Sequence, residues 1–319
     1  MKKILPFIIA VALGAGVFFG LSAYGKNRTA PPSEEAASAP ETASVSLYAK
    51  EQEETALAPA PNQLPEMDPE EELPALTYKE VLAEEEGLTI YRVQAKRYKG
   101  LVAEVTDTSR LTVGVCGEFF SDAINGKQLG TMADNAGAIF GVNGGEFYDP
   151  DGNGKGGLPL GNVFVDGEMR CGGYSHTIAM DAEGKMHCGL FSGDDCRNMG
   201  VQWALSYGPT LVIDGEIQEG LRTNLEEPRT AVGQREDGTV VFFCIQGRQA
   251  SALGVTEWQL ARIMRNDLGC VNAGNLDGGA SSYMYYHGAY MNIANSGNTY
   301  PRNVPTCILL MPVEGDTNG

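Results

Sequence analysis

Acid–glycine pairs separate short apolar runs at four places in the second half of the chain. Glycine after an acidic residue readily adopts the backbone of a two-residue hairpin turn, so such a pair beside apolar runs predicts paired antiparallel strands. The four pairs are Asp166-Gly167 after NVFV, Glu183-Gly184 after HTIAMDA, Asp214-Gly215 after TLVI, and Asp237-Gly238 before TVVFF. We therefore expect sheets built largely from hairpins.

Other segments extend this pattern and add helices. Residues 88–95, 101–105 and 111–115 have strand-like patterns, with a turn expected at Tyr98-Lys99-Gly100. Residues 256–268 (TEWQLARIMRNDL) follow the helical period, begin with a capping box and stop before a glycine. Residues 128–135 predict a second helix. The predicted fold class is α+β, with twisted mixed or antiparallel sheets, several hairpins and a few packed helices in a single domain.

The first part of the chain has a composition that does not support a packed core. Residues 4–21 are an uncharged apolar run after two lysines, which is typical of a signal peptide or a signal anchor. Residues 30–86 hold 15 Asp or Glu against 2 Lys, and eight of the 16 prolines, so they predict a disordered, extended linker. The expected organisation is a signal peptide or anchor (1–28), a linker (29–87) and one folded domain (88–319), secreted or held by its anchor at the extracellular face of the membrane.

The net charge and the cysteine spacing disfavour two functions, nucleic-acid binding and a thiolate metal site. The net charge is −18, and the folded part remains acidic without the linker. Nucleic acid is not an expected partner, because phosphate binding needs a basic face. None of the seven cysteines forms a C-x-x-C pair, which disfavours a thiolate metal site. Cys188 and Cys196 are a candidate disulfide, and buried free thiols are the alternative.

Polar residues flanked by glycines form a first candidate cluster directly after the apolar run AIFGV. It consists of Asn143, Gly144, Gly145 and Glu146. Glycines at the end of a strand let the backbone approach a ligand closely, and the two polar side chains would project there. A simple Asn-Gly-Gly turn is the alternative.

Two arginines at strand ends form a second candidate cluster. Arg229 opens a strand in the segment EPRTAVG, and Arg248 follows the very apolar run VVFFCI. An arginine in such a position can hold an anionic group through two parallel hydrogen bonds. A surface ion pair is the alternative for Arg229.

A third cluster, NLDGGASS, follows the predicted helix and the strand after it. Its glycines leave the carboxylate of Asp277 uncrowded, and its serines can donate hydrogen bonds. The candidate substrate-binding residues here are Asn275, Gly278, Gly279, Ser281 and Ser282. A Ser-His-Asp triad is disfavoured, because none of the three histidines is near a nucleophile-elbow sequence.

The segment DPDGNG has part of the spacing of a calcium loop. Asp149, Asp151 and Asn153 supply oxygen at its first, third and fifth positions, and Gly154 is the sixth. The twelfth position is Leu160 instead of an acid, so a glycine-rich loop is the default interpretation. No cofactor is expected otherwise.

These clusters, in this order, resemble the phosphodiester glycosidase family, which includes bacterial exopolysaccharide-associated proteins. The similarity extends over roughly residues 95–312. Its main pieces are KGLVAEVTDTSRLTVGV, GVNGGEFYDPDG, GLPLGNVFVDGE, YGPTLVIDGEI, EPRTAVGQREDGTVVFFCIQGR, TEWQLARIMRNDLGC, NLDGGASSYMYY and PRNVPTCILL. Glu146 departs from the family pattern, which commonly has a small or aromatic residue there.

The resemblance implies hydrolysis of a sugar-1-phosphodiester at the anomeric carbon of a cell-surface glycan or exopolysaccharide. In that case Asp277, Glu146 and Arg229 are the expected catalytic residues. Arg229 and Arg248 would hold the phosphate, Asp277 would support the anomeric carbon or activate water, and Asn143 and the serines would orient the substrate. The alternatives are a non-catalytic glycan-binding or polysaccharide-assembly protein on the same fold, and a transglycosylase.

Overall fold

The computed structural model describes residues 76–95, 98–249, 252–292 and 301–313, all within one compact unit, Ser44–Gly319. The predicted signal segment and most of the predicted linker lie outside the described residues. Among the residues that are described, no helix combines the length and the apolar character needed to cross a membrane.

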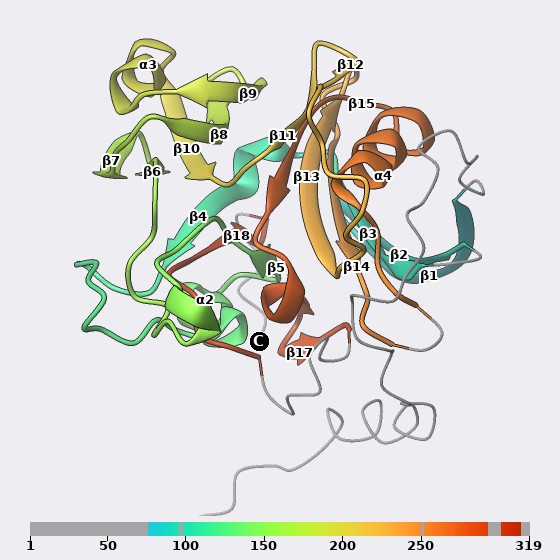
Figure 1. Cartoon of the computed structure of the whole chain (residues 1–319), viewed down its shortest axis with the longest axis horizontal. Coiled ribbons are helices and arrows are strands. Elements are labelled where there is room, and N and C mark those ends of the chain that lie inside the picture. Colours follow the sequence, from blue (N-terminus) through green and yellow to red (C-terminus); the bar gives the residue numbers. More distant parts are fainter. Residues whose placement is uncertain (1–75, 96–97, 250–251, 293–300, 314–319) are drawn as a thin grey trace, which may run out of the picture. The chain divides into compact units, whose positions relative to one another are not determined.

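An eight-stranded antiparallel sheet is the largest layer (Figure 1). Its strands are ordered β1-β2-β3-β14-β13-β15-β11-β12. The bounds are β1 (Thr77–Glu85), β2 (Leu88–Gln94), β3 (Lys99–Val105), β11 (Thr210–Ile213), β12 (Glu216–Ile217), β13 (Arg229–Arg235), β14 (Val240–Ile245) and β15 (Cys270–Leu276). The run VVFFCI of β14 is buried at every position, as expected for a strand covered on both faces.

Two five-stranded antiparallel sheets complete the strand layers. The second sheet has the order β7-β6-β10-β8-β9, and the third has the order β17-β16-β5-β18-β4. The second sheet contains β6 (Val163–Val165), β7 (Glu168–Cys171), β8 (Ser175–Asp181), β9 (Met186–Phe191) and β10 (Val201–Ser206). The third contains β4 (Leu111–Val115), β5 (Phe140–Asn143), β16 (Met284–Tyr286), β17 (Ala289–Tyr290) and β18 (Thr306–Leu310).

The four acid–glycine pairs form the predicted hairpins. They connect β6 to β7, β8 to β9, β11 to β12, and β13 to β14. Asp166 and Asp214 have φ angles of 51° and 49°, and the glycines that follow have 78° and 83°. Positive φ at both central residues is the geometry that matches the twist of paired strands.

Within the described residues three α-helices pack on these sheets, and two of them were predicted. The first, α4 (Glu257–Arg262), begins at the Thr256–Gln259 capping box and continues as a π-helical turn, η5 (Ile263–Asp267). The second is α2 (Leu129–Ala136). The third, α3 (Gly193–Asn198), is too short to show a helical period, although Ser192 and Asp195 form a capping box before it.

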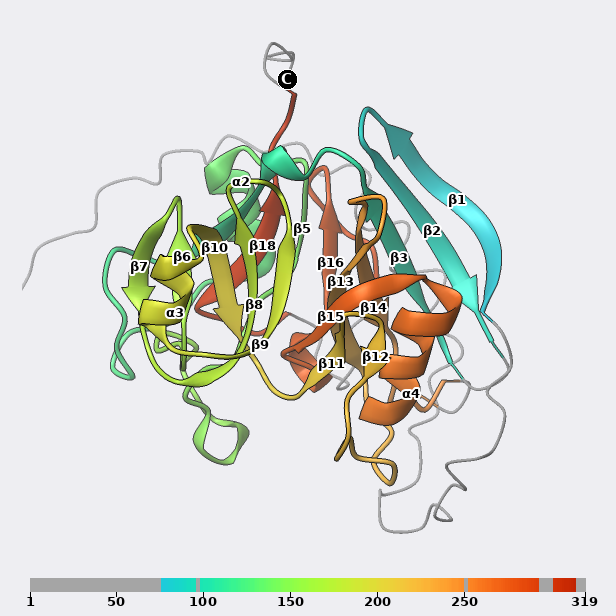
Figure 2. The same ribbon diagram turned by 90° about the horizontal axis from the view of Figure 1, so that it is seen from above.

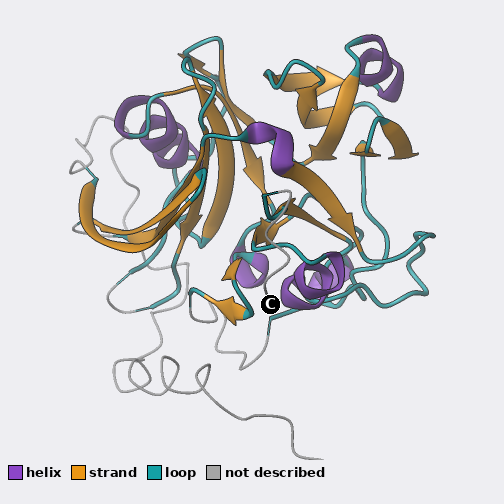
Figure 3. Ribbon diagram, turned by 180° about the vertical axis from the view of Figure 1, so that it is seen from behind, coloured by secondary structure: helices purple, strands orange, loops and turns teal. Residues whose placement is uncertain are grey.

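One apolar core joins all three sheets. It includes Phe242, Met180 and Ile308, one residue from each sheet. On its other face each sheet packs against one helix: α4 lies on the eight-stranded sheet, α3 on the second and α2 on the third. Figures 2 and 3 show the helices outside the strand layers. The three sheets therefore depend on one another for the burial of their inner faces.

The folded domain begins earlier than predicted. Strand β1 lies in the segment expected to be linker, and it pairs with β2 from Glu85 opposite Leu88 back to Thr77 opposite Gln94. The predicted boundary at residue 88 is therefore wrong, because β1 extends the edge of the sheet despite its acidic composition. The predicted turn is also shifted, since Lys99 is already part of β3.

Of the two alternatives for the cysteines, the structure has free thiols: all seven are unpaired, so the candidate disulfide between Cys188 and Cys196 is not formed. Cys188 pairs with Ile178 across the β8–β9 ladder and lies in the shared core. Cys196 packs with Ala179, whose side chain points to the opposite face of the same sheet. The sheet thus separates two thiols that are close in sequence.

The shared core predicts a large loss of stability from a single truncation. Phe242 is fully buried and contacts Phe140 with ring centroids 5.4 Å apart. Phe242→Ala should lower the free energy of unfolding by about 3–5 kcal/mol, measured by urea denaturation. Phe119→Ala is the matched control, since this side chain is 75% exposed, and should change it by less than about 0.5 kcal/mol. Equal effects of the two variants would contradict the described core.

Candidate active site

Segments that follow three strands, one from each sheet, meet at a pocket of about 340 Å³. The strands are β5, β10 and β15. The pocket is lined by Glu146, Phe147, Asp149, Tyr207, Gly208 and Asp277. Its volume is at the lower end of the range for small-molecule sites. Because each sheet contributes one wall, the pocket forms only when the three sheets pack together.

Backbone hydrogen bonds fix the three segments to one another. The Glu146 N–H donates to the Ser206 carbonyl (2.7 Å), and the Asp277 N–H donates to the Gly144 carbonyl (3.0 Å). A Cβ on Gly145 would collide with the Ser206 carbonyl, and Gly144 is equally crowded by a neighbouring strand. These two glycines therefore permit close packing of backbone. Their predicted contact with substrate stays a prediction.

Asn143 ends β5 and is only 1% exposed. Its Nδ2 donates to the Asp277 carbonyl (2.7 Å), while its Oδ1 accepts from Thr230 Oγ1 (2.8 Å) and from the Tyr283 N–H (3.2 Å). Asn143 thus acts on the site by positioning the backbone of Asp277. A direct contact between this amide and substrate stays a prediction.

The Asp277 carboxylate has one partnered and one unpartnered oxygen. Oδ1 accepts from the Gly278 N–H (3.0 Å), whereas Oδ2 is buried without a hydrogen-bond partner in the described part of the chain. Burial raises the pKa of Asp277 from 3.8 to about 6, against the opposing effects of Ser281, Arg302 and the Gly278 N–H. A carboxyl group with a pKa near neutrality can gain or lose a proton during a reaction.

Tyr207 lies beside Asp277 in the pocket wall and was not among the predicted site residues. Burial raises the pKa of its phenol, and the negative charge of Asp277 raises it further. Glu146 and Arg229 also act on this phenol electrostatically, with opposite signs. The neutral hydroxyl is consequently a hydrogen-bond donor at the centre of the predicted site residues.

Arg302 supplies a positive charge next to the pocket, against the lining residues Asp149 and Phe147, and was also not predicted. Its Nη1 donates to Asp149 Oδ2 (2.8 Å), and its guanidinium lies 4.8 Å from the centroid of the Phe147 ring. This ion pair lowers the pKa of Asp149, and the charge of Arg302 also favours the ionised form of Asp277. The side chain remains 22% exposed, so solvent reaches it.

The predicted calcium loop has a different arrangement. Asp149 already accepts from the Gly154 N–H (2.6 Å) through one oxygen and from Arg302 through the other. Asp151 and Asn153 are exposed, and Asn153 Nδ2 donates to the Asp151 carbonyl. No group of three acidic, histidine or cysteine side chains that could hold a metal occurs among the described residues. Calcium binding stays a prediction, and Arg302 would compete for the same carboxylate.

Arg229 lies behind the pocket wall and is 1% exposed. Its guanidinium is 3.7 Å from carboxylate oxygens of both Glu227 and Glu257, and its Nε donates to the Val255 carbonyl (3.3 Å). Burial lowers the pKa of Arg229 despite these two carboxylates. Arg229 does not line the pocket itself, but its charge acts on Tyr207. A catalytic role for Arg229 stays a prediction.

Arg248 lies at the surface near the third cluster. It has a positive φ of 57°, and its Nη2 donates to Glu227 Oε1 (3.1 Å). A Cβ on Gly279 would lie 3.2 Å from the same nitrogen, so the guanidinium covers this glycine. The structure therefore brings Arg248 to the Asp277 loop but outside the pocket lining, and its predicted contact with substrate is untested.

The remaining residues of the third cluster surround Asp277. Asn275, two positions earlier on β15, is fully buried, with Nδ2 3.5 Å from the Gly208 carbonyl and Oδ1 without a partner among the described residues. Ser281 lowers the pKa of Asp277, although its hydroxyl does not reach hydrogen-bond geometry. Ser282 is fully buried. Their roles in binding substrate stay predictions.

Comparison with known proteins identifies the class to which this fold and pocket belong. Residues 136–311, more than half of the chain, match the phosphodiester glycosidase family. The chain therefore belongs to that family. The matched segment contains every residue that lines the pocket, including Glu146, Tyr207 and Asp277, and also Arg302 beside it.

Solved structures share the fold at low sequence identity. The catalytic domain of zebrafish N-acetylglucosamine-1-phosphodiester alpha-N-acetylglucosaminidase, auto-inhibited by its pro-peptide, matches with a TM-score of 0.61 and 21% identity, over 75% of this chain and 88% of that chain. A hypothetical protein from Synechocystis matches with a TM-score of 0.55 and 15% identity, over 70% and 62%. These matches confirm the predicted α+β fold.

A curated relative is more similar in sequence but over a shorter segment. The SPbeta prophage-derived uncharacterized protein YomE of Bacillus subtilis is 34% identical over 103 residues. The match covers 31% of this chain and 16% of that protein. This chain therefore spans only a small part of the length of that relative.

The buried carboxyl predicts an unusual dependence of stability on pH. Between about pH 4 and pH 6, folded Asp277 retains a proton that the unfolded chain has lost, so the free energy of unfolding should fall as pH rises. The loss is on the order of 3 kcal/mol, at 1.4 kcal/mol for each pKa unit. Asp277→Asn should therefore be more stable than the parent at pH 8 and similar to it near pH 4, by urea denaturation. Asp214→Asn, an exposed turn variant, is the control, and parallel pH curves for all three proteins would contradict the assignment.

Proposed function

We propose that this protein hydrolyses the glycosidic C–O bond of a sugar-1-phosphodiester in a cell-surface glycan or exopolysaccharide. The observation that carries the proposal is the Asp277 carboxylate in the pocket: one of its oxygens is buried and has no partner among the described residues. The chain's membership of the phosphodiester glycosidase family supports the same reaction class. The zebrafish relative is named for a substrate of this chemical class. Its low identity to this chain supports the fold, and the reaction is inferred from the site.

Asp277 has the properties that cleavage at an anomeric carbon requires. A phosphate group, with a second pKa of about 6, leaves far more readily than a sugar alkoxide, so protonation of the leaving group is less important than in an ordinary glycosidase. A carboxylate is needed to stabilise the oxocarbenium-like carbon or to activate water. The ionised form of Asp277 would do this above about pH 6.

Residues in and beside the pocket divide the remaining tasks. The Arg302 guanidinium is the positive charge within the influence of Asp277, so it would hold the phosphate and offset the acidic surroundings. The Tyr207 hydroxyl would donate a hydrogen bond to the substrate. Glu146 is exposed at the pocket wall, where it would orient sugar hydroxyls or assist the attacking water.

The proposed setting is outside the cell. The apolar run after the first lysines supports export, and the acidic, proline-rich segment would hold the domain away from the membrane. Cell-surface glycans are the substrates that such a placement makes accessible.

Loss of the Asp277 charge should abolish most of the activity. With a synthetic sugar-1-phosphodiester, Asp277→Asn should lower kcat/KM by about 10²–10⁴-fold, and the parent enzyme should gain activity as pH rises through about 6. Asp237→Asn, an exposed turn variant, should keep parental activity. In isotope-labelled water the label should appear in the sugar. Label in the phosphate would mean P–O cleavage, and full activity of Asp277→Asn would remove this residue from the mechanism.

Arg302 should determine affinity for the phosphate. Arg302→Lys keeps the charge but loses the planar guanidinium, so KM should rise about tenfold or more, with a smaller change in kcat. Arg92→Lys is the control, since Arg92 forms only an exposed ion pair with Glu80. A larger effect of Arg248→Lys than of Arg302→Lys would instead assign phosphate binding to Arg248.

A further inference from the structure

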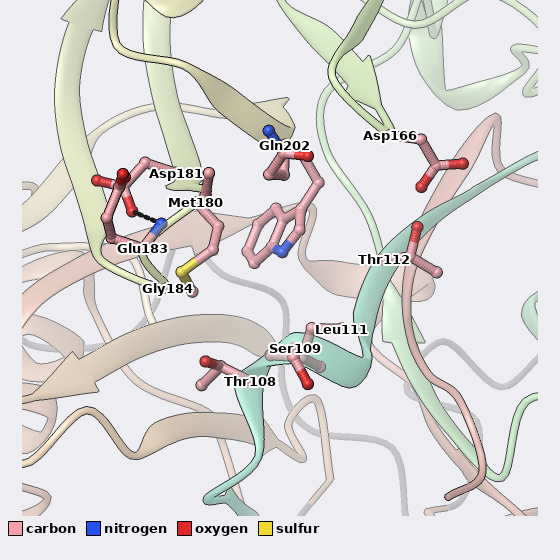
Figure 4. A pocket seen from close by; sticks show the side chains of 12 residues that line it. Thr108, Ser109, Leu111, Thr112, Asp166, Met180, Asp181, Glu183, Gly184 and Gln202 are labelled. Carbon is pink, nitrogen blue, oxygen red and sulfur yellow. Dashed lines mark hydrogen bonds between the residues drawn. The ribbon is translucent and has the colours of Figure 1, made fainter. Parts of the chain in front are cut away.

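A second pocket, of about 360 Å³, lies on another part of the same domain (Figure 4). Its walls come from the short helix η3 (Thr108–Arg110) with the start of β4, from the β8–β9 turn, and from β10. In Figure 4, Asp166 and Thr112 lie on one side of the pocket and Glu183 and Gly184 on the other. None of the predicted site residues lines it.

The pocket combines an apolar floor with hydrogen-bonding groups. Leu111, Met180 and the indole of Trp203 contribute apolar surface. The polar residues around them are Thr108, Ser109, Thr112, Asp166, Asp181, Glu183 and Gln202. Carboxylates accept hydrogen bonds, while hydroxyl and amide groups both donate and accept them. No lysine or arginine lines this pocket, so its charge repels anions and phosphates.

Trp203 provides an independent indication of a ligand. Its side chain is 2% exposed and forms part of the pocket wall, yet its Nε1–H has no acceptor in the described part of the chain. The indole nitrogen is only a donor, and a buried tryptophan usually finds a partner for it. The N–H is closed to solvent in this arrangement, so a ligand oxygen would supply that acceptor after a small shift of the side chains around the indole.

The β8–β9 turn, which forms one wall of the second pocket, is held in place by its own hydrogen bonds. Asp181 Oδ1 accepts from the N–H groups of Glu183 (3.1 Å) and Lys185 (2.8 Å), and its Oδ2 is 2.7 Å from His187 Nε2. Because Asp181 is engaged by the turn itself, Glu183 is the carboxylate of this wall that is placed to meet a ligand. The site is thus largely preformed, which limits the entropy lost on binding.

We infer that this second pocket binds an uncharged sugar unit of a glycan. A sugar ring offers an apolar face for the floor, hydroxyl donors for the carboxylates and oxygen acceptors for the Trp203 N–H and the Gln202 amide. The inference goes beyond the proposed hydrolysis, because the pocket contains none of the residues assigned to that reaction. It defines a separate glycan-binding site.

Strand β10 connects the two pockets. Gln202 and Trp203 lie near its start in the second pocket, and Tyr207 follows its end in the first. Four residues of strand span on the order of 13 Å. The two sites are therefore distinct positions on one rigid element, and binding at the second can be measured without turnover at the first.

Tryptophan fluorescence provides a direct test, because the chain has only two tryptophans. In a Trp258→Phe background, Trp203 is the only reporter. Titration with cellotetraose, maltotetraose and N-acetylchitotetraose should give a saturable change with at least one of them. Gln202→Ala removes a hydrogen-bonding amide and Asp166→Asn removes the charge of an acceptor. Each variant should weaken that binding by about tenfold.

Matched variants separate this proposal from its alternatives. Asp214→Asn makes the same change as Asp166→Asn at the equivalent position of another hairpin, and it should leave binding unchanged. Asp277→Asn should also leave it unchanged, whether or not it abolishes hydrolysis. The proposal is overturned if none of the three oligosaccharides binds, if Asp277→Asn removes the binding, or if glucose-1-phosphate or Ca²⁺ binds there instead.

Discussion

The side chain of Asn143 is the interaction on which the arrangement of the site depends. Asn143 is the last residue of β5. Its side-chain oxygen accepts hydrogen bonds from Thr230 and Tyr283, and its side-chain nitrogen donates to the carbonyl of Asp277. These hydrogen bonds connect the third sheet to the eight-stranded sheet at the point where β5 and β15 end. In a buried setting each unmade bond would be costly, so the amide strongly favours one position for the loop that carries Asp277.

Holding the Asp277 loop in that position has an energetic cost, and the proposed catalytic role of Asp277 explains it. The loop buries a carboxylate oxygen that has no partner in the part of the chain the structure describes, and burial raises the pKa of Asp277 to about 6. Such an arrangement destabilises the ionised folded protein, and it is retained where a reactive group is useful. Arg302 is held by Asp149 and Phe147 at the same pocket, so the positive and negative charges stay separate and available to a ligand.

Local chemistry predicted much of the fold. The acid–glycine pairs gave the hairpins, because positive φ at a two-residue turn depends on the residues of the turn itself. The Thr256–Gln259 capping box likewise gave the start of α4. Strand β1 was missed because its acidic composition is that of a linker, and it becomes a strand only by pairing with β2.

The sequence by itself determined the hairpins, the helices α2 and α4, the family and the identity of Asp277 and Glu146 as pocket residues. Only the tertiary structure decided which cation accompanies them: Arg302 pairs with the lining residue Asp149, while Arg229 is buried against two carboxylates and does not line the pocket. It also placed Tyr207 beside Asp277. The physical reason is that turn and helix signals act over a few residues, whereas burial and charge pairing depend on how three separate sheets pack.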